Sequence, residues 1–255
     1  MSVNYSEAPV IPKRIIAAML DFGESVLKMT GIRLSETQLA AFDLYARELI
    51  AWNARFNLTG ITDPEQIYVK HFLDSLSCWQ AMRTLPTTRV IDVGSGAGFP
   101  GLPLKILQPE LQLTLLEATA KKARFLEHMV QVLRPGSVTV LAERAEEVGQ
   151  LAAHREAYDW ALARAVAPMA VLAEYMLPLV RVGGCALAQK GKDASHEAEG
   201  AKPAIEKLGA ELSELIQAQI PGLNEERWLV VLKKIAPTPA DYPRRPGMPG
   251  KRPLA

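Results

Sequence analysis

Closely spaced glycines preceded by a carboxylate form the stretch of this sequence best suited to bind a ligand. Gly94, Gly96 and Gly98 follow the short apolar run Val90–Val93, and Asp92 lies inside that run. An apolar run that ends in glycines is typical of a buried strand entering a tight turn. Glycines let the backbone approach a ligand closely, and a helix that begins after them presents its N-terminus to the same place. The pattern therefore predicts a nucleotide-type binding site.

Two classes of ligand fit the spacing of these glycines. Gly96–Gly101 matches the G-x-G-x-x-G pattern of dinucleotide sites, and Glu117 ends the next apolar run about 20 residues on, where a carboxylate can accept hydrogen bonds from both hydroxyls of a ribose. The G-x-G-x-G spacing that begins at Gly94 matches the looser loop of S-adenosylmethionine enzymes. Asp92 favours the second class, because its carboxylate would repel a pyrophosphate but suit a cationic ligand.

The composition limits the classes of protein to which the chain can belong. It has 255 residues, 49% of them hydrophobic, which predicts one sizeable core with a small appendage. The formal net charge of +1 limits any contact with nucleic acid to local basic patches. Cys78 and Cys185 lie far apart and away from any histidine cluster, as expected of reduced core residues in a cytoplasmic protein without a metal site. We expect neither a signal peptide nor a membrane span.

The first 85 residues are expected to form a small helical bundle. Apolar residues recur at helical spacing over 15–29 and 35–52. Asp63 is expected to cap a third helix, with Pro64 at its first position. We therefore interpret residues 1–85 as a helical domain that precedes the glycine loop.

From residue 86 the pattern changes to strands that alternate with helices, which predicts an α/β domain over 86–234. The last two strands flank the turn Pro221-Gly222 and should run antiparallel. A mostly parallel, Rossmann-like sheet of seven strands that ends in such a pair is usual for S-adenosylmethionine-dependent methyltransferases, whereas dehydrogenases normally finish with parallel strands. The expected strands are 89–93, 113–116, 138–141, 160–163, 184–189, 211–219 and 227–234, and the expected helices are 101–108, 119–133, 145–152, 168–180 and 197–208.

The tail, 235–255, has no apolar periodicity and is rich in proline. Proline favours an extended chain, and basic side chains outnumber the single acid, Asp241. We expect an extended basic strap that packs back along the α/β domain. Its basic residues are Arg244, Arg245, Lys251 and Arg252.

Eight short segments, spread from about residue 35 to the end of the chain, carry motifs that occur in the same order in one family. They are Trp52–Thr59, Lys70–Ser75, Asp92–Gly101, Lys121–Leu126, Arg144–Glu146, Ala163–Ala165, Lys190–Gly191 and Tyr242–Gly247. Each motif is weak by itself, but the ordered set is specific. On these segments the chain resembles the RsmG (GidB) methyltransferases, which methylate N7 of a guanine in bacterial 16S ribosomal RNA.

The resemblance implies a class I methyltransferase fold with a helical N-terminal extension. It also implies S-adenosylmethionine as cofactor and 16S ribosomal RNA, within the small ribosomal subunit or an assembly intermediate, as substrate. The glycine loop would lie against the methionine part of the cofactor, Glu117 and its followers at the ribose and adenine, and Ala145 with Glu146 beside the adenine. The residues implied around the cofactor are Gly94, Gly96, Phe99, Glu117, Ala118, Thr119, Ala145, Glu146 and Arg164.

Methylation at guanine N7 makes modest chemical demands. N7 already has a free lone pair, so no proton has to leave and no general base is required. We expect the rate to come mainly from holding N7 in line with the methyl group, and we assign no catalytic residue. Basic residues near the strand ends and in the tail would contact RNA phosphates. The candidates are Lys190, Arg244, Arg245, Lys251 and Arg252.

Three polar residues near the expected site have two interpretations each. His71 and Asp74 lie three residues apart on one helical face. We interpret them as a hydrogen-bonded pair that fixes the helical region to the α/β domain. The alternative is a role at the active-site edge or in RNA contact. Arg164 follows the fourth strand and is interpreted as a site residue. Its alternative role is a structural ion pair with Glu146 or Asp92.

Two other functions remain compatible with these patterns. The first is an NAD-dependent oxidoreductase. Comparing the binding of labelled NAD with that of labelled S-adenosylmethionine would distinguish it from a methyltransferase. The second is a regulator or assembly factor that binds S-adenosylmethionine and whose helical domain binds a ribosomal particle. A test for methyl transfer to RNA would separate it from a methyltransferase.

Overall fold

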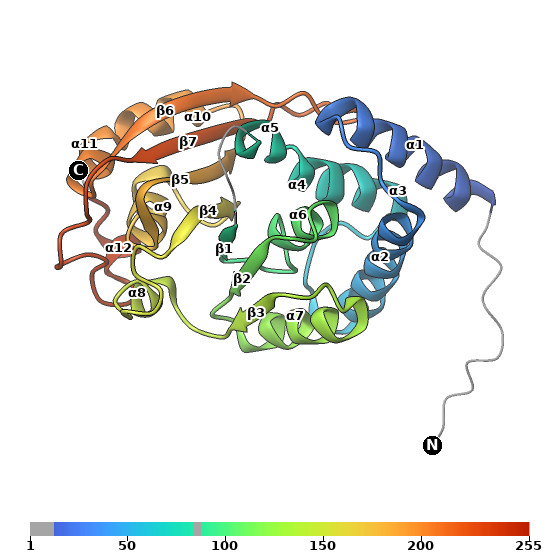
Figure 1. Cartoon of the computed structure of the whole chain (residues 1–255), viewed down its shortest axis with the longest axis horizontal. Helices are drawn as coiled ribbons and strands as arrows, with labels where there is room; N and C mark the ends of the chain where they lie inside the picture. Colours follow the sequence, from blue (N-terminus) through green and yellow to red (C-terminus); the bar gives the residue numbers. More distant parts are fainter. Residues whose placement is uncertain (1–12, 84–87, 255) are drawn as a thin grey trace, which may run out of the picture.

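The apolar runs form a single seven-stranded sheet in the order β3-β2-β1-β4-β5-β7-β6 (Figure 1). The computed structural model describes residues 13–83 and 88–254. β7 is antiparallel to both of its neighbours, while the pairs among β1 to β5 are parallel. All the expected strands are confirmed with small shifts at their ends: β1 Arg89–Val93, β2 Gln112–Leu116, β3 Val138–Leu141, β4 Tyr158–Arg164, β5 Val180–Lys190, β6 Ala210–Gln217 and β7 Trp228–Lys234.

Successive side chains of each strand point to opposite faces of the sheet, and each face has its own layer of helices (Figure 1). In β1, Val90 packs against the N-terminal helices, whereas Ile91 and Val93 pack against the C-terminal ones. The first layer contains α1 Lys13–Thr30, α2 Glu36–Phe56, α3 Pro64–Ile67, η1 Tyr68–Leu73, α4 Asp74–Leu76, α5 Trp79–Met82, α6 Gly101–Leu107 and α7 Ala120–Leu133. The second contains α8 Ala145–Val148, α9 Met169–Met176, α10 Ala194–Gly200, α11 Lys202–Lys207 and α12 Met248–Lys251.

The N-terminal helices share one hydrophobic cluster with the sheet. Phe42 and Phe72 belong to the same cluster as Leu102 on α6 and Leu162 on β4. Asp63 caps α3, as expected, but the helix then widens into a π-helical turn, η1. π-Helical turns are rare and occur frequently at functional sites. The boundary at residue 85 stays a prediction, and residues 1–12 and 84–87 lie outside the described part of the chain.

Three of the expected helices differ from the prediction. The helix expected over 145–152 ends at Val148, with Gly149 as its C-cap. The other two differ because of proline. The helix expected over 168–180 ends at Met176, because Pro178 has no N–H to continue it, and the chain enters β5 instead. The helix expected over 197–208 is divided into α10 and α11, with Pro203 in the first turn of the second helix. Among the described helices, none combines the length and the hydrophobicity that crossing a membrane requires.

The tail returns along the second helical layer, as expected (Figure 1). It is not extended throughout, because it contains the short helix α12. The Arg155 guanidinium donates hydrogen bonds to the carbonyl groups of Gly149, Thr238, Pro239 and Tyr242. An extended segment has few backbone hydrogen bonds of its own, so a guanidinium with five donors can satisfy several of its carbonyl groups at once. These contacts hold the start of the tail against the loop that joins α8 to β4.

Candidate functional site

A cavity of about 450 Å³ lies at the carboxyl ends of β1, β2 and β4, where ligands bind in sheets of this kind. Its volume is in the range of small-molecule sites. Thr119 is absent from its lining, and its backbone N–H instead donates to the Glu117 carboxylate. The other residues expected around the cofactor all line the cavity: Gly94, Gly96, Phe99, Glu117, Ala118, Ala145, Glu146 and Arg164.

The glycine loop needs its glycines for two different reasons. At Gly98, with φ of 97°, a Cβ would lie 2.5 Å from the Tyr45 hydroxyl, so packing excludes a side chain. At Gly96, with φ of 60°, a Cβ would meet only the Gly94 carbonyl oxygen, at 3.9 Å. The space above Gly96 is therefore open, and a ligand can lie directly against the loop. The open space at Gly96 leaves room for a cofactor such as S-adenosylmethionine.

Glu117 holds the loop as well as lining the cavity. Its side chain is buried, and its two oxygens accept hydrogen bonds from the Gly96 N–H at 2.9 Å and the Thr119 N–H at 2.7 Å. A carboxylate has about four acceptor positions, so both oxygens keep capacity for ribose hydroxyls. The role in shaping the loop was not expected from the sequence, because a strand-end acid indicates only that a ribose could bind there.

Asp92 acts beneath the loop and does not line the cavity. Its side chain is fully buried, and Oδ2 accepts a hydrogen bond from the Gly101 N–H at 2.9 Å, whereas Oδ1 has no partner among the described residues. Burial raises the pKa of Asp92 to about 7. The carboxylate thus fixes the start of α6. The sequence suggested that Asp92 would attract a cationic ligand. Because Asp92 is not part of the cavity wall, it can act on such a ligand only across the loop and not by direct contact.

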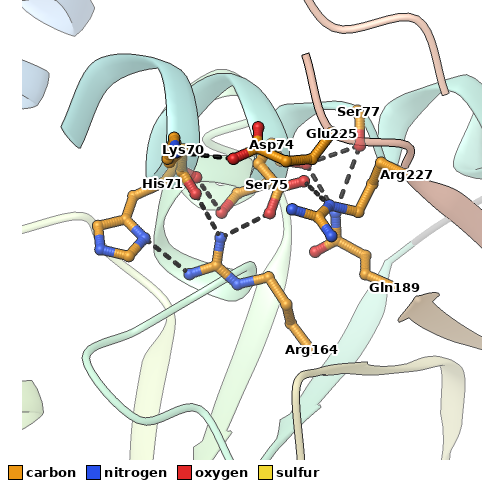
Figure 2. Close-up of polar contacts among 9 residues, drawn as sticks. All are labelled: Lys70, His71, Asp74, Ser75, Ser77, Arg164, Gln189, Glu225 and Arg227. Carbon is orange, nitrogen blue, oxygen red and sulfur yellow. Dashed lines mark hydrogen bonds and ion pairs between the residues drawn. The ribbon is translucent and has the colours of Figure 1, made fainter. Parts of the chain in front are cut away.

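Arg164 joins β4 to the N-terminal helices (Figure 2). Its guanidinium donates to Asp74 Oδ2 at 2.9 Å, to the Lys70 carbonyl oxygen at 3.2 Å and to His71 Nδ1 at 3.2 Å. Asp74 is 2% exposed and forms a second ion pair, in which Arg227 Nε donates to its Oδ1 at 2.7 Å. The structural ion pair considered as the alternative role of Arg164 does form, but its partner is the buried Asp74 rather than Glu146 or Asp92.

The expected side-chain hydrogen bond between His71 and Asp74 does not occur among the described residues. Both side chains instead bind Arg164, and in this way they do tie the helical region to the sheet (Figure 2). His71 also lines the cavity, stacks on Phe99 with ring centroids 4.4 Å apart, and lies 2.8 Å from Thr59 Oγ1 through its Nε2. Burial, and after it the Arg164 charge, lowers the pKa of His71 to about 3. The imidazole is neutral near pH 7 and remains at the edge of the cavity.

Thr59 is a cavity residue that sequence reasoning did not assign. The Asn53 side chain holds its backbone through two hydrogen bonds of 2.9 Å, one to the Thr59 N–H and one to its carbonyl oxygen. The available signal was the segment from Asn53 to Thr59, which combines turn-forming residues with two amides and a hydroxyl. Its position depends on the packing of α2 against η1, which a single sequence does not show.

The basic residues proposed for RNA divide into two groups. Lys190 donates to the Ala167 carbonyl oxygen at 2.8 Å and to Glu197 at 2.6 Å, and Arg244 pairs with the fully buried Glu174 at 2.6 Å. These two charges are used inside the protein. The remaining side chains are exposed and have no ion pair within the described residues: Arg245, Lys251 and Arg252. RNA contact by any of the five residues stays a prediction.

The tail also reaches the wall of the cavity. The Gly247 N–H donates to Glu146 Oε1 at 2.8 Å, and Glu146 is one of the residues expected beside the adenine. Gly247 has φ of 81°, a conformation that suits glycine. Across residues 13–83 and 88–254, no three histidine, cysteine or acidic side chains gather as a metal site would require.

Proteins of a known family resemble this chain in sequence. The family model described as rRNA small subunit methyltransferase G (GidB) matches residues 38–227. Two proteins named ribosomal RNA small subunit methyltransferase G, from Roseiflexus sp. strain RS-1 and Chloroflexus aggregans, are 54% and 51% identical to this chain over 88% of its length and 95% and 93% of theirs. The M. jannaschii TYW2 structure in complex with AdoMet has a TM-score of 0.49 and 12% identity, over 64% of this chain and 77% of its own. With a family match over most of its length and relatives above 50% identity, this chain belongs to the rRNA small subunit methyltransferase G (GidB) family.

Proposed function

We propose that this protein transfers a methyl group from S-adenosylmethionine to N7 of a guanine in 16S ribosomal RNA. The observation that carries the proposal is the cavity at the sheet edge, where an open glycine cradle lies beside the buried Glu117 in a chain of this family. Gly94 and Gly96 would hold the methionine part of the cofactor, Glu117 the ribose, and Glu146 the adenine side. When bound, the cofactor supplies a methyl group on a positively charged sulfur.

The cavity residues suit a reaction that depends on position. His71 is neutral and hydrogen-bonded on both ring nitrogens, so it is not poised as a base. The Arg164 guanidinium is turned onto Asp74 and His71. Positive charge moves onto the purine as N7 is methylated, so a cation aimed at the base would oppose the reaction. Rate acceleration would therefore come from holding N7 in line with the methyl group.

The RNA would be presented by a ribosomal particle. N7 faces the major groove, which in A-form RNA is too deep and narrow for a side chain to read, so the target guanine must be unpaired or reached during assembly. The net charge of +1 gives little affinity for bare RNA and favours the small subunit or an assembly intermediate as substrate. Exposed Arg245, Lys251 and Arg252 would contact phosphates. The free, buried cysteines Cys78 and Cys185 support a cytoplasmic location.

Mass spectrometry of 16S ribosomal RNA from cells with and without the gene tests this function. One N7-methylguanosine should disappear from the deletion strain and return with the wild-type gene, but not with a Gly96→Asp variant. Purified protein and S-adenosylmethionine should restore the mark on small subunits from the deletion strain. An unchanged set of modified nucleosides in the deletion strain would contradict the proposal.

A further inference from the structure

A chain of hydrogen bonds beside the glycine loop fixes the direction of one hydroxyl group, that of Thr59. A guanidinium has N–H donors and no acceptor, so the 3.2 Å contact from Arg164 requires His71 Nδ1 to accept. A neutral imidazole that accepts at Nδ1 carries its proton on Nε2. His71 Nε2–H therefore donates across 2.8 Å to Thr59 Oγ1.

The Thr59 oxygen has a second donor. The Ile61 N–H donates to the same Oγ1 at 3.1 Å. A hydroxyl has two acceptor positions and one hydrogen, so with both positions filled its hydrogen must be given to another group. No acceptor for it occurs among the residues that the structure describes, and Thr59 lines the cavity. The hydroxyl thus donates into the cavity, from a backbone that Asn53 holds in place.

The order of the strands places this donor relative to the cofactor. Along the sheet edge, the residues expected at the adenine follow β3, Glu117 follows β2, the glycine loop follows β1 and Arg164 ends β4. Thr59 is connected through His71 to Arg164 and Phe99, beyond the glycine loop from the adenine. The methionine part of the cofactor would lie at this side of the cavity under the proposed function, and the base that receives the methyl group would approach from the same side.

We propose that the Thr59 hydroxyl donates a hydrogen bond to O6 of the target guanine and thereby selects guanine over adenine. This role rests on the proposed function, because a base methylated at N7 presents the edge that contains O6. Guanine offers acceptors at both N7 and O6, whereas adenine has an amino donor in place of O6. The hydroxyl is uncharged, so it can contact O6 without opposing the positive charge that develops on the purine. His71 and Arg164 are positioning residues that set the direction of the hydroxyl.

The test compares two Thr59 variants on two substrates. Thr59→Val has nearly the same shape without the hydroxyl, and Thr59→Ser retains the hydroxyl. The substrates are reconstituted small subunits whose target position carries guanine or 2-aminopurine, which keeps N7 but lacks O6. Thr59→Val should lower kcat/KM on guanine by roughly 2- to 10-fold, the effect of one hydrogen bond, and should change it little on 2-aminopurine. Thr59→Ser should behave like wild type, and calorimetry should give all three proteins the same affinity for S-adenosylmethionine.

The histidine provides an independent test. The amide of His71→Gln can accept from Arg164 and donate to Thr59, so it should keep the preference for guanine over 2-aminopurine. His71→Leu can do neither and should lose that preference.

Several outcomes would overturn the assignment. Equal losses on both substrates for Thr59→Val would overturn it, as would a weakened affinity for S-adenosylmethionine, which would direct the hydroxyl to the cofactor. The same holds if His71→Leu keeps the preference that His71→Gln loses. Wild-type protein that methylates no guanine would refute the proposed function and this role together, whereas active wild type with an indifferent Thr59→Val would refute this role alone.

Discussion

Arg244→Ala should destabilise this protein far more than Arg245→Ala, although both residues belong to the same basic tail. The Glu174 carboxylate is fully buried and accepts from the Arg244 backbone N–H at 2.8 Å, from Nε at 2.9 Å and from Nη2 at 2.6 Å. Truncating Arg244 leaves this buried charge with a single backbone donor. Arg245 is exposed and has no such partner in the described parts of the chain.

The size of the difference follows from burial. Removing one partner of a buried ion pair costs about 3–5 kcal/mol. The Arg244 side chain is 23% exposed, so water can replace part of its contact, and we expect the lower end of that range. A loss of about 3 kcal/mol corresponds to a fall in Tm of about 6–12 °C for a chain of this size. Arg245→Ala should change the free energy of unfolding by no more than about 0.5 kcal/mol.

Urea unfolding followed by circular dichroism measures this difference directly. Hydrogen exchange of the tail amides would show whether the loss is local, because a tail that detaches before the core unfolds limits the global effect. Equal unfolding midpoints for the two variants, with equal protection of the tail amides, would refute the assignment of Arg244 to a buried pair.

Four further outcomes follow from the site and the tail. Gly96→Asp should remain folded, because aspartate tolerates φ of 60° and the space there is open, yet calorimetry should detect no binding of S-adenosylmethionine. Glu117→Ala should weaken that binding by about 1.5–3 kcal/mol, and a 2′-deoxy analogue should lose much less; equal losses would leave Glu117 only a structural role. The pKa of His71 is about 3, below the value of about 6.5 expected in the unfolded chain. Between these two pH values the unfolded state binds one more proton than the folded state, so the free energy of unfolding falls as the pH drops from about 6.5 towards 3. Urea unfolding across this range should show a shallower fall for His71→Gln. Arg245→Ala should flatten the log–log salt dependence of small-subunit binding by roughly 0.7–0.9 if the residue contacts one phosphate, and an unchanged slope would remove it from the RNA interface.

The sheet could be predicted because its signals are local. Each strand is a short apolar run between turn-forming residues, so Val90–Val93 indicates a strand whatever packs around it. The glycines after it, and Glu117 at the end of the next strand, likewise indicate a site at the sheet edge. These features need no knowledge of distant parts of the chain.

Several of the contacts that the sequence did not predict join distant segments. Arg164 binds Asp74, which directly follows the π-helical turn, and no residue pattern in the sequence indicated that turn. The positive charge of Arg244 suggested a contact with RNA. Its actual partner, Glu174, lies 70 residues earlier in the chain, on a helix whose other residues are mostly apolar. The donor role of Thr59 depends on a histidine tautomer that only the folded arrangement defines.

The hydrogen bond from Gly247 to Glu146 joins residues that are 101 positions apart, and this separation has a consequence for synthesis. Chains fold as they are translated, with N-terminal parts first. A nascent chain that has reached the end of β7 already contains the glycine loop, Glu117 and both arginines that bind Asp74. Its Glu146 still lacks the tail contact that fixes the far wall of the cavity. The contact at Glu146 therefore forms only after residues 235–247 have been translated. Chains released from the ribosome with and without residues 235–255 should differ in their affinity for S-adenosylmethionine.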